Sequence, residues 1–196
     1  MRGSMNRLLS VKRKGRYQDL SLFKVPREFR GRSVYVVQLW WLTQSLLFHP
    51  SPQIFFGWRR FLLRLFGAKI GHRVLIRSST EIVYPWKLRI GDYSWVGDHV
   101  ILYCLDEIII GNNSVISQYS HICAGTHNSK SIQFDILAKP ITIGTECWIA
   151  SDVYIAPGVT IGDGTIVGAR SSVFHKLPGG MICYGNPARP IRRRAR

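Results

Sequence analysis

Histidines in the middle of the chain are the first residues whose chemistry could make a reaction centre. They are His99, His121 and His127. An imidazole accepts a proton near neutral pH, so each of them is a candidate general base. Three imidazoles that converge on one point could instead bind zinc. The residue types alone leave both chemistries open.

The four cysteines are the second group that could react. They are Cys104, Cys123, Cys147 and Cys183, and they show neither CxxC spacing nor the density of a disulfide-linked secreted domain. We therefore expect reduced, structural cysteines in a cytoplasmic protein.

An aliphatic residue at every sixth position is the pattern that must place these groups. The phase runs through Ile70, Ile76 and Ile82; Ile90, Val96 and Leu102; Ile110, Ile116 and Ile122; and Ile143, Ile149, Ile155, Ile161, Val167 and Val173. An amphipathic helix has a period of about 3.6 and a strand a period of 2, so neither explains it. A triangular prism does, with one hexad for each flat face, three hexads for each coil and the aliphatic residue pointing to the axis. Small residues would permit the tight corners.

Breaks in this phase predict where the chain leaves the prism. Two residues are added after Ile82 and again after Leu102, each enough for a bulge at a corner. The gap from Ile122 to Ile143 is much longer and predicts a loop at about residues 128–140, directly after His127. Loops on a rigid scaffold often hold functional residues. We therefore expect an all-β parallel β-helix of about five coils at residues 70–178, with a loop after the third coil.

The segment before the prism is rich in tryptophan, phenylalanine and arginine. Residues 34–48 and 54–66 predict two short helices, the first of which is too short to span a bilayer. Residues 34–69 would cover the open end of the β-helix, or contact a membrane surface, or do both. Residues 1–4 (MRGS) look like a vector leader, so that residues 1–33 comprise a leader and a basic segment. Residues 179–196 form a C-terminal segment with a basic tail.

The net charge of +16 would attract polyanions or anionic headgroups. Much of this charge lies near the two ends, at Arg7, Lys12, Arg13, Lys14, Arg16, Arg189, Arg192, Arg193, Arg194 and Arg196. Such runs are usually solvated tails. No nucleic-acid-binding motif accompanies them, so nucleic acid is not an expected partner.

Four stretches carry a resemblance to a known family. They are KPITIG at residues 139–144, CWIA at residues 147–150, APGVTIG at residues 156–162 and YGNPAR at residues 184–189. In order and spacing they resemble the hexapeptide-repeat acyltransferases, and the run from residue 55 to residue 71 is similar to the colanic acid and exopolysaccharide biosynthesis branch. The resemblance implies a left-handed coil, a homotrimer, acetyl-CoA as cosubstrate without a required metal, and a glycan hydroxyl as acceptor.

The same resemblance implies roles for individual residues. His127 matches the catalytic histidine, which would act as general base in direct transfer, and the backbone N–H of Ser151 matches the oxyanion donor. The CoA contacts carry over to Trp148, Ser151, Ala169 and Arg189. Where the family commonly has Thr-Lys, this sequence has Phe174-His175 and then Lys176. Either His175 or Lys176 is therefore expected at the CoA phosphates.

A second departure from the family pattern concerns the acceptor. The asparagine that orients the sugar in maltose and galactoside acetyltransferases aligns with Gly97, so simple-sugar acceptors are not expected. Asp98, Asp106 and Glu107 are the candidate substitutes. Two other functions stay open: a zinc lyase of the carbonic anhydrase type on the same scaffold, and a non-catalytic basic module that binds a membrane or a polyanion.

Overall fold

The computed structural model describes residues 17–26 and 29–195. The predicted leader at residues 1–4 and five basic residues of the first segment, Arg7, Lys12, Arg13, Lys14 and Arg16, lie outside these ranges, as does Arg196. The described chain forms two compact units. The smaller contains residues 17–26 and 127–137, and the larger contains residues 29–126 and 138–195.

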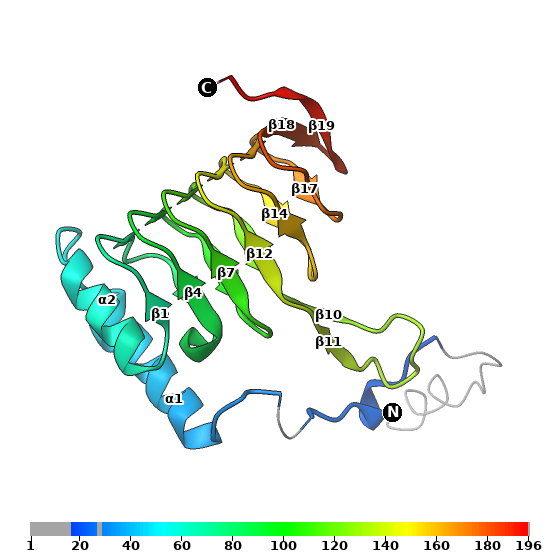
Figure 1. The fold of residues 1–196 in the computed structure, drawn as a ribbon. Helices are drawn as coiled ribbons and strands as arrows, with labels where there is room; N and C mark the ends of the chain where they lie inside the picture. The colour runs from blue at the N-terminus through cyan, green and yellow to red at the C-terminus, as the bar shows by residue number, and fades with distance from the viewer. Residues whose placement is uncertain (1–16, 27–28, 196) are drawn as a thin grey trace, which may run out of the picture. The chain divides into compact units, whose positions relative to one another are not determined.

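Three sheets form the faces of the larger unit, and their strands are parallel except for the last one in the chain, which pairs antiparallel with the strand before it (Figure 1). Sheet A contains β1 (Lys69–Ile70), β4 (Leu88–Ile90), β7 (Ile108–Ile110), β12 (Ile141–Ile143) and β15 (Thr160–Ile161). Sheet B contains β2 (Leu75–Ile76), β5 (Trp95–Val96), β8 (Val115–Ile116), β13 (Trp148–Ile149), β16 (Ile166–Val167), β18 (Met181–Gly185) and β19 (Ala188–Arg193). Sheet C contains β3 (Glu81–Ile82), β6 (Ile101–Tyr103), β9 (His121–Cys123), β14 (Tyr154–Ile155) and β17 (Ser172–Val173). The chain visits A, B and C in turn, which confirms the predicted prism.

Aliphatic residues of the six-residue phase fill the axis of the prism. Ile90 pairs with Ile110, and Ile110 pairs with Ile143, so the same position recurs in each coil. Most of these side chains are completely buried. Each contributes about 1.5–3 kcal/mol when removed from water, which makes the prism a continuous hydrophobic core.

Glycine follows the aliphatic residue because the coils approach closely at the corner between sheets A and B. A Cβ atom on Gly111 would lie 2.6 Å from the carbonyl carbon of Gly144, and one on Gly91 would lie 2.8 Å from that of Gly111. Neither glycine has a positive φ angle. Several larger residues at the corners do, including Tyr93 and Glu146. The expectation that small residues serve the tight turns is therefore incomplete, since these glycines serve the packing of one coil on the next.

Buried serines join successive coils at the same corner. Ser94 Oγ donates to the carbonyl oxygen of Gly111 at 2.7 Å, and Ser114 Oγ donates to that of Gly144 at 2.8 Å. A hydroxyl buried without a partner would destabilise the fold, so these bonds explain why serine is tolerated at an inward corner.

Helices cover the N-terminal coil, whose outer backbone groups have no preceding coil to pair with (Figure 1). They are α1 (Val34–Thr43) and α2 (Phe56–Leu65), joined through a short π-helix, η2 (Gln44–Phe48). Trp40 Nε1 donates to the carbonyl oxygen of Ile82 at 2.7 Å, and Arg64 Nη2 donates to that of Ile70 at 2.8 Å. The helices therefore supply partners to the edges of sheets C and A.

Arg59 does the same for sheet B from a completely buried position. Its Nε donates to the carbonyl oxygen of Ile76 at 2.6 Å, and its two Nη atoms donate to Ser51 Oγ, Pro52 O and Gln53 O at 2.8, 2.8 and 2.6 Å. Burial, and then the charge of Arg77, lower the pKa of the Arg59 guanidinium from its usual value. One guanidinium thus connects the coil to the segment between the helices.

The structure contains a few further short elements. They are η1 (Leu20–Leu22), η3 (Pro85–Lys87), β10 (Gly125–His127) and β11 (Ile136–Ala138). Strands β10 and β11 pair with each other. The predicted loop at residues 128–140 is therefore not wholly a loop: it contains β11, and with β10 it forms a two-stranded excursion between β9 and β12. No helix among the described residues is both long and apolar enough to cross a bilayer.

Candidate active site

His127, at the end of β10, is held in one orientation by Phe134. The two rings stack with centroids 4.1 Å apart and planes 8° from parallel. His127 Nδ1 lies 2.8 Å from the carbonyl oxygen of Phe134. A carbonyl oxygen can only accept, so this contact assigns the proton to Nδ1 and leaves the lone pair on Nε2. The side chain is exposed, so Nε2 can act as a proton acceptor.

The tip of the excursion is built to keep Phe134 in place. Phe134 has a φ angle of +54°, which is strained for a bulky residue. Asn128 N donates to the carbonyl oxygen of Asp135 at 2.8 Å, and Ser131 Oγ donates to Asp135 Oδ2 at 2.6 Å. These contacts hold the loop that orients the imidazole.

The N-terminal segment completes the smaller unit. Asp19 N donates to the carbonyl oxygen of Ile132 at 2.7 Å, and the ring of Phe23 lies 6.1 Å from that of His127. Sequence reasoning did not select Phe23 or Phe134. The one available signal is that Ile132 and Phe134 are large apolar residues in an otherwise polar run.

Four of the predicted CoA contacts lie along sheet B in the C-terminal coils of the larger unit. Trp148 is half-exposed on β13, and its Nε1 donates to Ser117 Oγ at 3.1 Å. Ser151 and Ala169 occupy equivalent corners of successive coils, and Arg170 N donates to the carbonyl oxygen of Ser151 at 3.0 Å. Arg189 lies exposed on β19. An aromatic surface and a cation in this arrangement suit the apolar and phosphate parts of CoA.

The backbone N–H of Ser151 is available as a donor. Its neighbours are engaged, since Ala150 N donates to the carbonyl oxygen of Val167 at 2.9 Å and Asp152 N to that of Gln118 at 3.0 Å. Within the described part of the chain, the N–H of Ser151 has no acceptor. A free N–H at a corner is the kind of group that stabilises a developing oxyanion.

His175 and Lys176 lie on another edge of the prism. They follow β17 of sheet C, at the corner that leads back to sheet A, and both are exposed. Trp148, Ser151 and Ala169 instead lie on sheet B and at its corner with sheet C. One chain does not bring the two groups together on a single edge.

The three carboxylates predicted to contact the acceptor lie at two different corners of the prism. Asp98 follows β5, where Arg77 Nε lies 3.3 Å from Asp98 Oδ2 and Ser79 Oγ donates to Asp98 Oδ1 at 2.8 Å. Asp106 and Glu107 lie at the next corner, before β7. Asp106 Oδ1 accepts from Glu107 N at 2.7 Å, and Glu107 is paired with Arg89.

A groove of about 300 Å³ lies beside Asp98 on sheet B. Trp95, which is 53% exposed, Gln118 and Phe56 of α2 line it together with Asp98. Gly97 also lines it, and a Cβ atom there would lie 2.8 Å from Gln118 N in the next coil. The close approach of the coils explains why glycine, and not asparagine, stands at this position.

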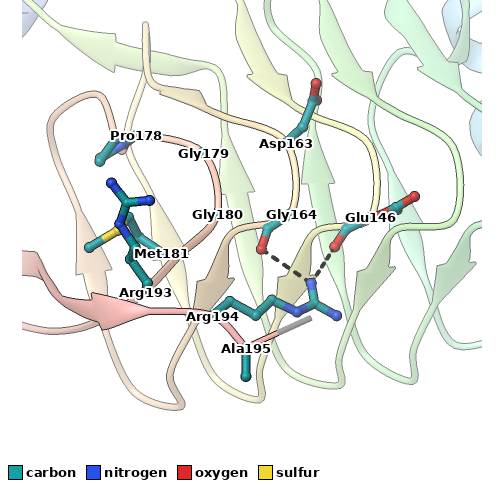
Figure 2. Close-up of a pocket in the computed structure, with 10 residues that line it drawn as sticks. All are labelled: Glu146, Asp163, Gly164, Pro178, Gly179, Gly180, Met181, Arg193, Arg194 and Ala195. Carbon is teal, nitrogen blue, oxygen red and sulfur yellow. Dashed lines mark hydrogen bonds between the residues drawn. The ribbon is translucent and has the colours of Figure 1, made fainter.

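A second hollow, of about 960 Å³, lies at the C-terminal end, and none of the predicted site residues lines it (Figure 2). Arg194 Nη1 donates across it to the carbonyl oxygens of Glu146 and Gly164 at 2.7 and 3.2 Å. These bonds tie the basic tail to the prism, so we assign this hollow a structural role.

The other histidines of the middle coils have their own neighbours within the larger unit. His99 stacks on Tyr119 with centroids 5.1 Å apart, and His121 lies on β9 with a buried Nε2 that has no partner among the described residues. Burial lowers the pKa of His121 below 6.5, against a smaller raising effect of Glu81. No cluster of three or more metal-binding side chains occurs in the residues that the structure describes.

All four cysteines are buried and free. Burial raises the thiol pKa of Cys104, Cys147 and Cys183. These thiols are therefore neutral near pH 7 and weakly nucleophilic, which fits structural roles.

Comparison with known proteins defines the class first. Residues 140–175 match the family model described as bacterial transferase hexapeptide (six repeats). A maltose O-acetyltransferase from Clostridium difficile 630 has a TM-score of 0.76 at 24% identity over 83% of this chain and 88% of that one. Galactoside acetyltransferase in complex with coenzyme A has a TM-score of 0.75 at 22% identity over 87% and 92%. This likeness identifies the fold as the left-handed parallel β-helix.

Sequence relatives narrow the class. WcaF of Escherichia coli K12, named as a colanic acid biosynthesis acetyltransferase, is 61% identical over 177 residues, which are 90% of this chain and 97% of WcaF. Galactoside O-acetyltransferase of the same strain is 30% identical over 68% of each chain. The chain belongs to the hexapeptide-repeat acetyltransferase family, as the sequence motifs predict.

Proposed function

We propose that the protein transfers an acetyl group from acetyl-CoA to a hydroxyl group of a glycan, or of a glycan precursor, in surface polysaccharide biosynthesis. The similarity to WcaF along almost its whole length supports this reaction and this pathway class. The observation that carries the chemistry is the contact between His127 Nδ1 and the carbonyl oxygen of Phe134, since in the neutral imidazole it fixes the proton on Nδ1 and makes the exposed Nε2 the proton acceptor.

In the proposed mechanism His127 acts as general base. A sugar hydroxyl is barely ionised at neutral pH, so its proton must leave as the oxygen attacks the thioester carbon. Nε2 takes that proton, and the Phe134 carbonyl stabilises the resulting imidazolium through Nδ1–H. When the C–S bond breaks, Nε2 returns the proton to the departing CoA thiolate. Transfer is direct, and the neutral, buried thiols of the chain take no part.

The N–H of Ser151 is proposed to stabilise the tetrahedral intermediate. Removing one such donor typically costs about 100-fold to 1,000-fold in rate. Its freedom from other acceptors among the described residues supports this role.

CoA is proposed to bind between neighbouring copies of the chain. Trp148, Ser151, Ala169 and Arg189 would form one wall, and His175 or Lys176 would reach the phosphates. Because these residues lie along two edges of the prism, they can face one ligand only if the edges belong to two copies. A homotrimer, which the family resemblance implies, would produce that arrangement.

The glycan is proposed to lie against the groove beside Asp98. Trp95 offers an aromatic face for a sugar ring, and Asp98 and Gln118 offer polar groups for its hydroxyls. Asp106 and Glu107 lie at a different corner and do not line this groove, so Asp98 is the preferred acceptor contact. A cytoplasmic location follows from the use of acetyl-CoA and from the free cysteines.

Release of CoA thiol tests this function. The purified protein should release it from acetyl-CoA only when glycan precursor or polysaccharide is added, and mild alkali should remove the new acetyl group, because esters are cleaved under conditions that leave amides intact. An alkali-resistant product would show an amine acceptor and overturn the proposal. Failure with nucleotide-linked, lipid-linked and polymeric glycans alike would also overturn it.

A further inference from the structure

The helices over the N-terminal coil are apolar on the side that faces away from the prism. In α1 the residues turned to the coil are Val37, Trp40 and Thr43, and the remaining positions are also apolar except for Gln38. The outer cap surface consists of Val34, Tyr35, Leu39, Trp41, Leu42, Leu46, Leu47, Ile54, Phe55, Trp58, Phe61 and Leu65, all of them exposed. A helix that is hydrophobic all round is normally covered all round. The outer cap surface therefore needs an occupant.

These side chains form stripes and not scattered positions. Tyr35, Leu39, Leu42 and Leu46 follow the spacing of one helical face, and so do Trp58, Phe61 and Leu65. The stripes adjoin, because Trp58 Nε1 donates to the carbonyl oxygen of Leu47 at 3.0 Å. Contiguous apolar patches of this kind mark interaction surfaces.

The charge in the segment that builds the cap and the first two strands has one sign, and the first acidic side chain after it is the exposed Glu81 on β3. Residues 29–80 contain no aspartate or glutamate. They contain eight cationic side chains: Arg30, Arg32, Arg59, Arg60, Arg64, Lys69, Arg73 and Arg77. Arg32, Lys69 and Arg73 are exposed, so the rim of the surface is positive.

We propose that the outer cap surface docks on an anionic lipid bilayer, with the apolar stripes at headgroup depth and the cationic rim on the phosphates. Trp41, Trp58 and Tyr35 suit that depth, because each combines an apolar ring with a polar group. The protein lies on the bilayer and does not cross it, in keeping with the length of α1 and α2.

Charge distinguishes this occupant from a second copy of the chain. If two outer cap surfaces met face to face, the exposed cations Arg32, Lys69 and Arg73 of each copy would be brought together without a carboxylate from residues 29–80, and like charges repel. Anionic headgroups instead neutralise them. The docking does not depend on the acetyl-transfer reaction and can be measured without it.

Vesicle sedimentation of the full-length protein tests the proposal. Wild type should pellet with vesicles of phosphatidylglycerol and phosphatidylcholine and much less with phosphatidylcholine alone. Leu42→Gln with Leu46→Gln should lower the partition coefficient about tenfold or more, since burial of two leucines is lost. The matched control is Ile191→Gln, because Ile191 on β19 is 51% exposed and Leu46 is 63% exposed. Ile191→Gln should bind as wild type does.

Charge reversal tests the rim. Arg32→Glu with Lys69→Glu should lower binding about tenfold or more and weaken its dependence on salt. Arg192→Glu with Arg193→Glu, at the other end of the chain, should have a much smaller effect. Equal losses in the two pairs would show attraction by net charge alone and would overturn the proposal.

Tryptophan fluorescence of the wild-type protein gives a first readout that does not depend on the leucine or charge-reversal variants. Brominated anionic lipid should quench part of the tryptophan emission, and Trp41→Phe with Trp58→Phe should remove the quenched part. Absence of quenching would overturn the proposal. So would a leucine variant that keeps its vesicle binding but changes its oligomeric state in light scattering, because the surface would then be an interface between copies.

Discussion

The coils of the prism and the segments attached to them use their side chains in opposite ways. In the coils, inward aliphatics, serines and glycines contact the next coil, and only outward side chains such as Trp95 and Trp148 remain for the proposed ligands. In the excursion after β9 and the helices before β1, exposed groups are presented instead: the imidazole of His127 and the apolar outer cap surface. The difference indicates that the inward positions of the repeat provide stability, and that the departures from it carry the proposed general base and the proposed docking surface.

The largest expected effect is a loss of acetyl-transfer activity from a substitution outside the coils. His127→Ala should lower acetyl transfer by about 100-fold to 10,000-fold, because the general base is lost. Its melting temperature should stay close to that of wild type, since the side chain is exposed. His99→Asn is the matched control and should retain activity. Unchanged activity in His127→Ala would remove this residue from the mechanism.

The next effect lies where the helices meet the coils. Arg59→Met should destabilise the fold by about 3 kcal/mol or more, because several buried acceptors lose a charged donor at once. Urea unfolding measures this change. Arg73→Met, at an exposed position, should cost little, and a similar loss in both variants would contradict the role assigned to Arg59.

A smaller loss is expected from one methyl group inside the prism. Gly111→Ala should cost about 1–3 kcal/mol, since the new Cβ atom meets backbone that has no room to move. Gly57→Ala provides the comparison. A Cβ atom at Gly57 would have only Arg60 Nη2 near it, at 3.8 Å, so alanine should stabilise α2 by up to about 1 kcal/mol. Effects of the same sign would refute this account of the glycine ladder.

The smallest effect is a dependence on pH inside the prism. Burial lowers the pKa of His121 below its unfolded value of 6.5, so the unfolded chain binds the proton more readily. The contribution to stability is therefore complete above pH 6.5 and is lost as the pH falls from 6.5 through the folded-state pKa. His121→Phe should flatten the stability profile in that range. Parallel profiles for the two proteins would show that His121 does not titrate as described.

The regular part of the molecule could be predicted from sequence because its rule is local. The period from Ile70 to Val173 determines the three sheets, and the gap after Ile122 locates the excursion. Family motifs determine the class. These signals depend on residue type and spacing, which the sequence displays directly.

The rest depends on contacts between residues far apart in sequence. The carbonyl oxygen of Phe134 orients His127. This contact depends on the positive φ angle of Phe134, which the amino-acid sequence does not reveal. The separation of Asp98 from Asp106 and Glu107 required knowledge of which corner each occupies. In the sequence, Arg59 stands in an aromatic-rich segment and gives no sign of burial. It is buried because it donates to the unpaired backbone edge of the first coil.

The excursion leaves the pairing of the coils undisturbed. Successive partners on sheet A differ by 20 residues from Ile90 to Ile110 (110 − 90), by 33 from Ile110 to Ile143 (143 − 110) and by 18 from Ile143 to Ile161 (161 − 143). Closing a loop lengthened by a dozen or so residues costs only about 1 kcal/mol or less. The corner between sheets C and A can therefore accept inserted segments of different length and sequence, such as the one that contains His127, while the scaffold keeps its register.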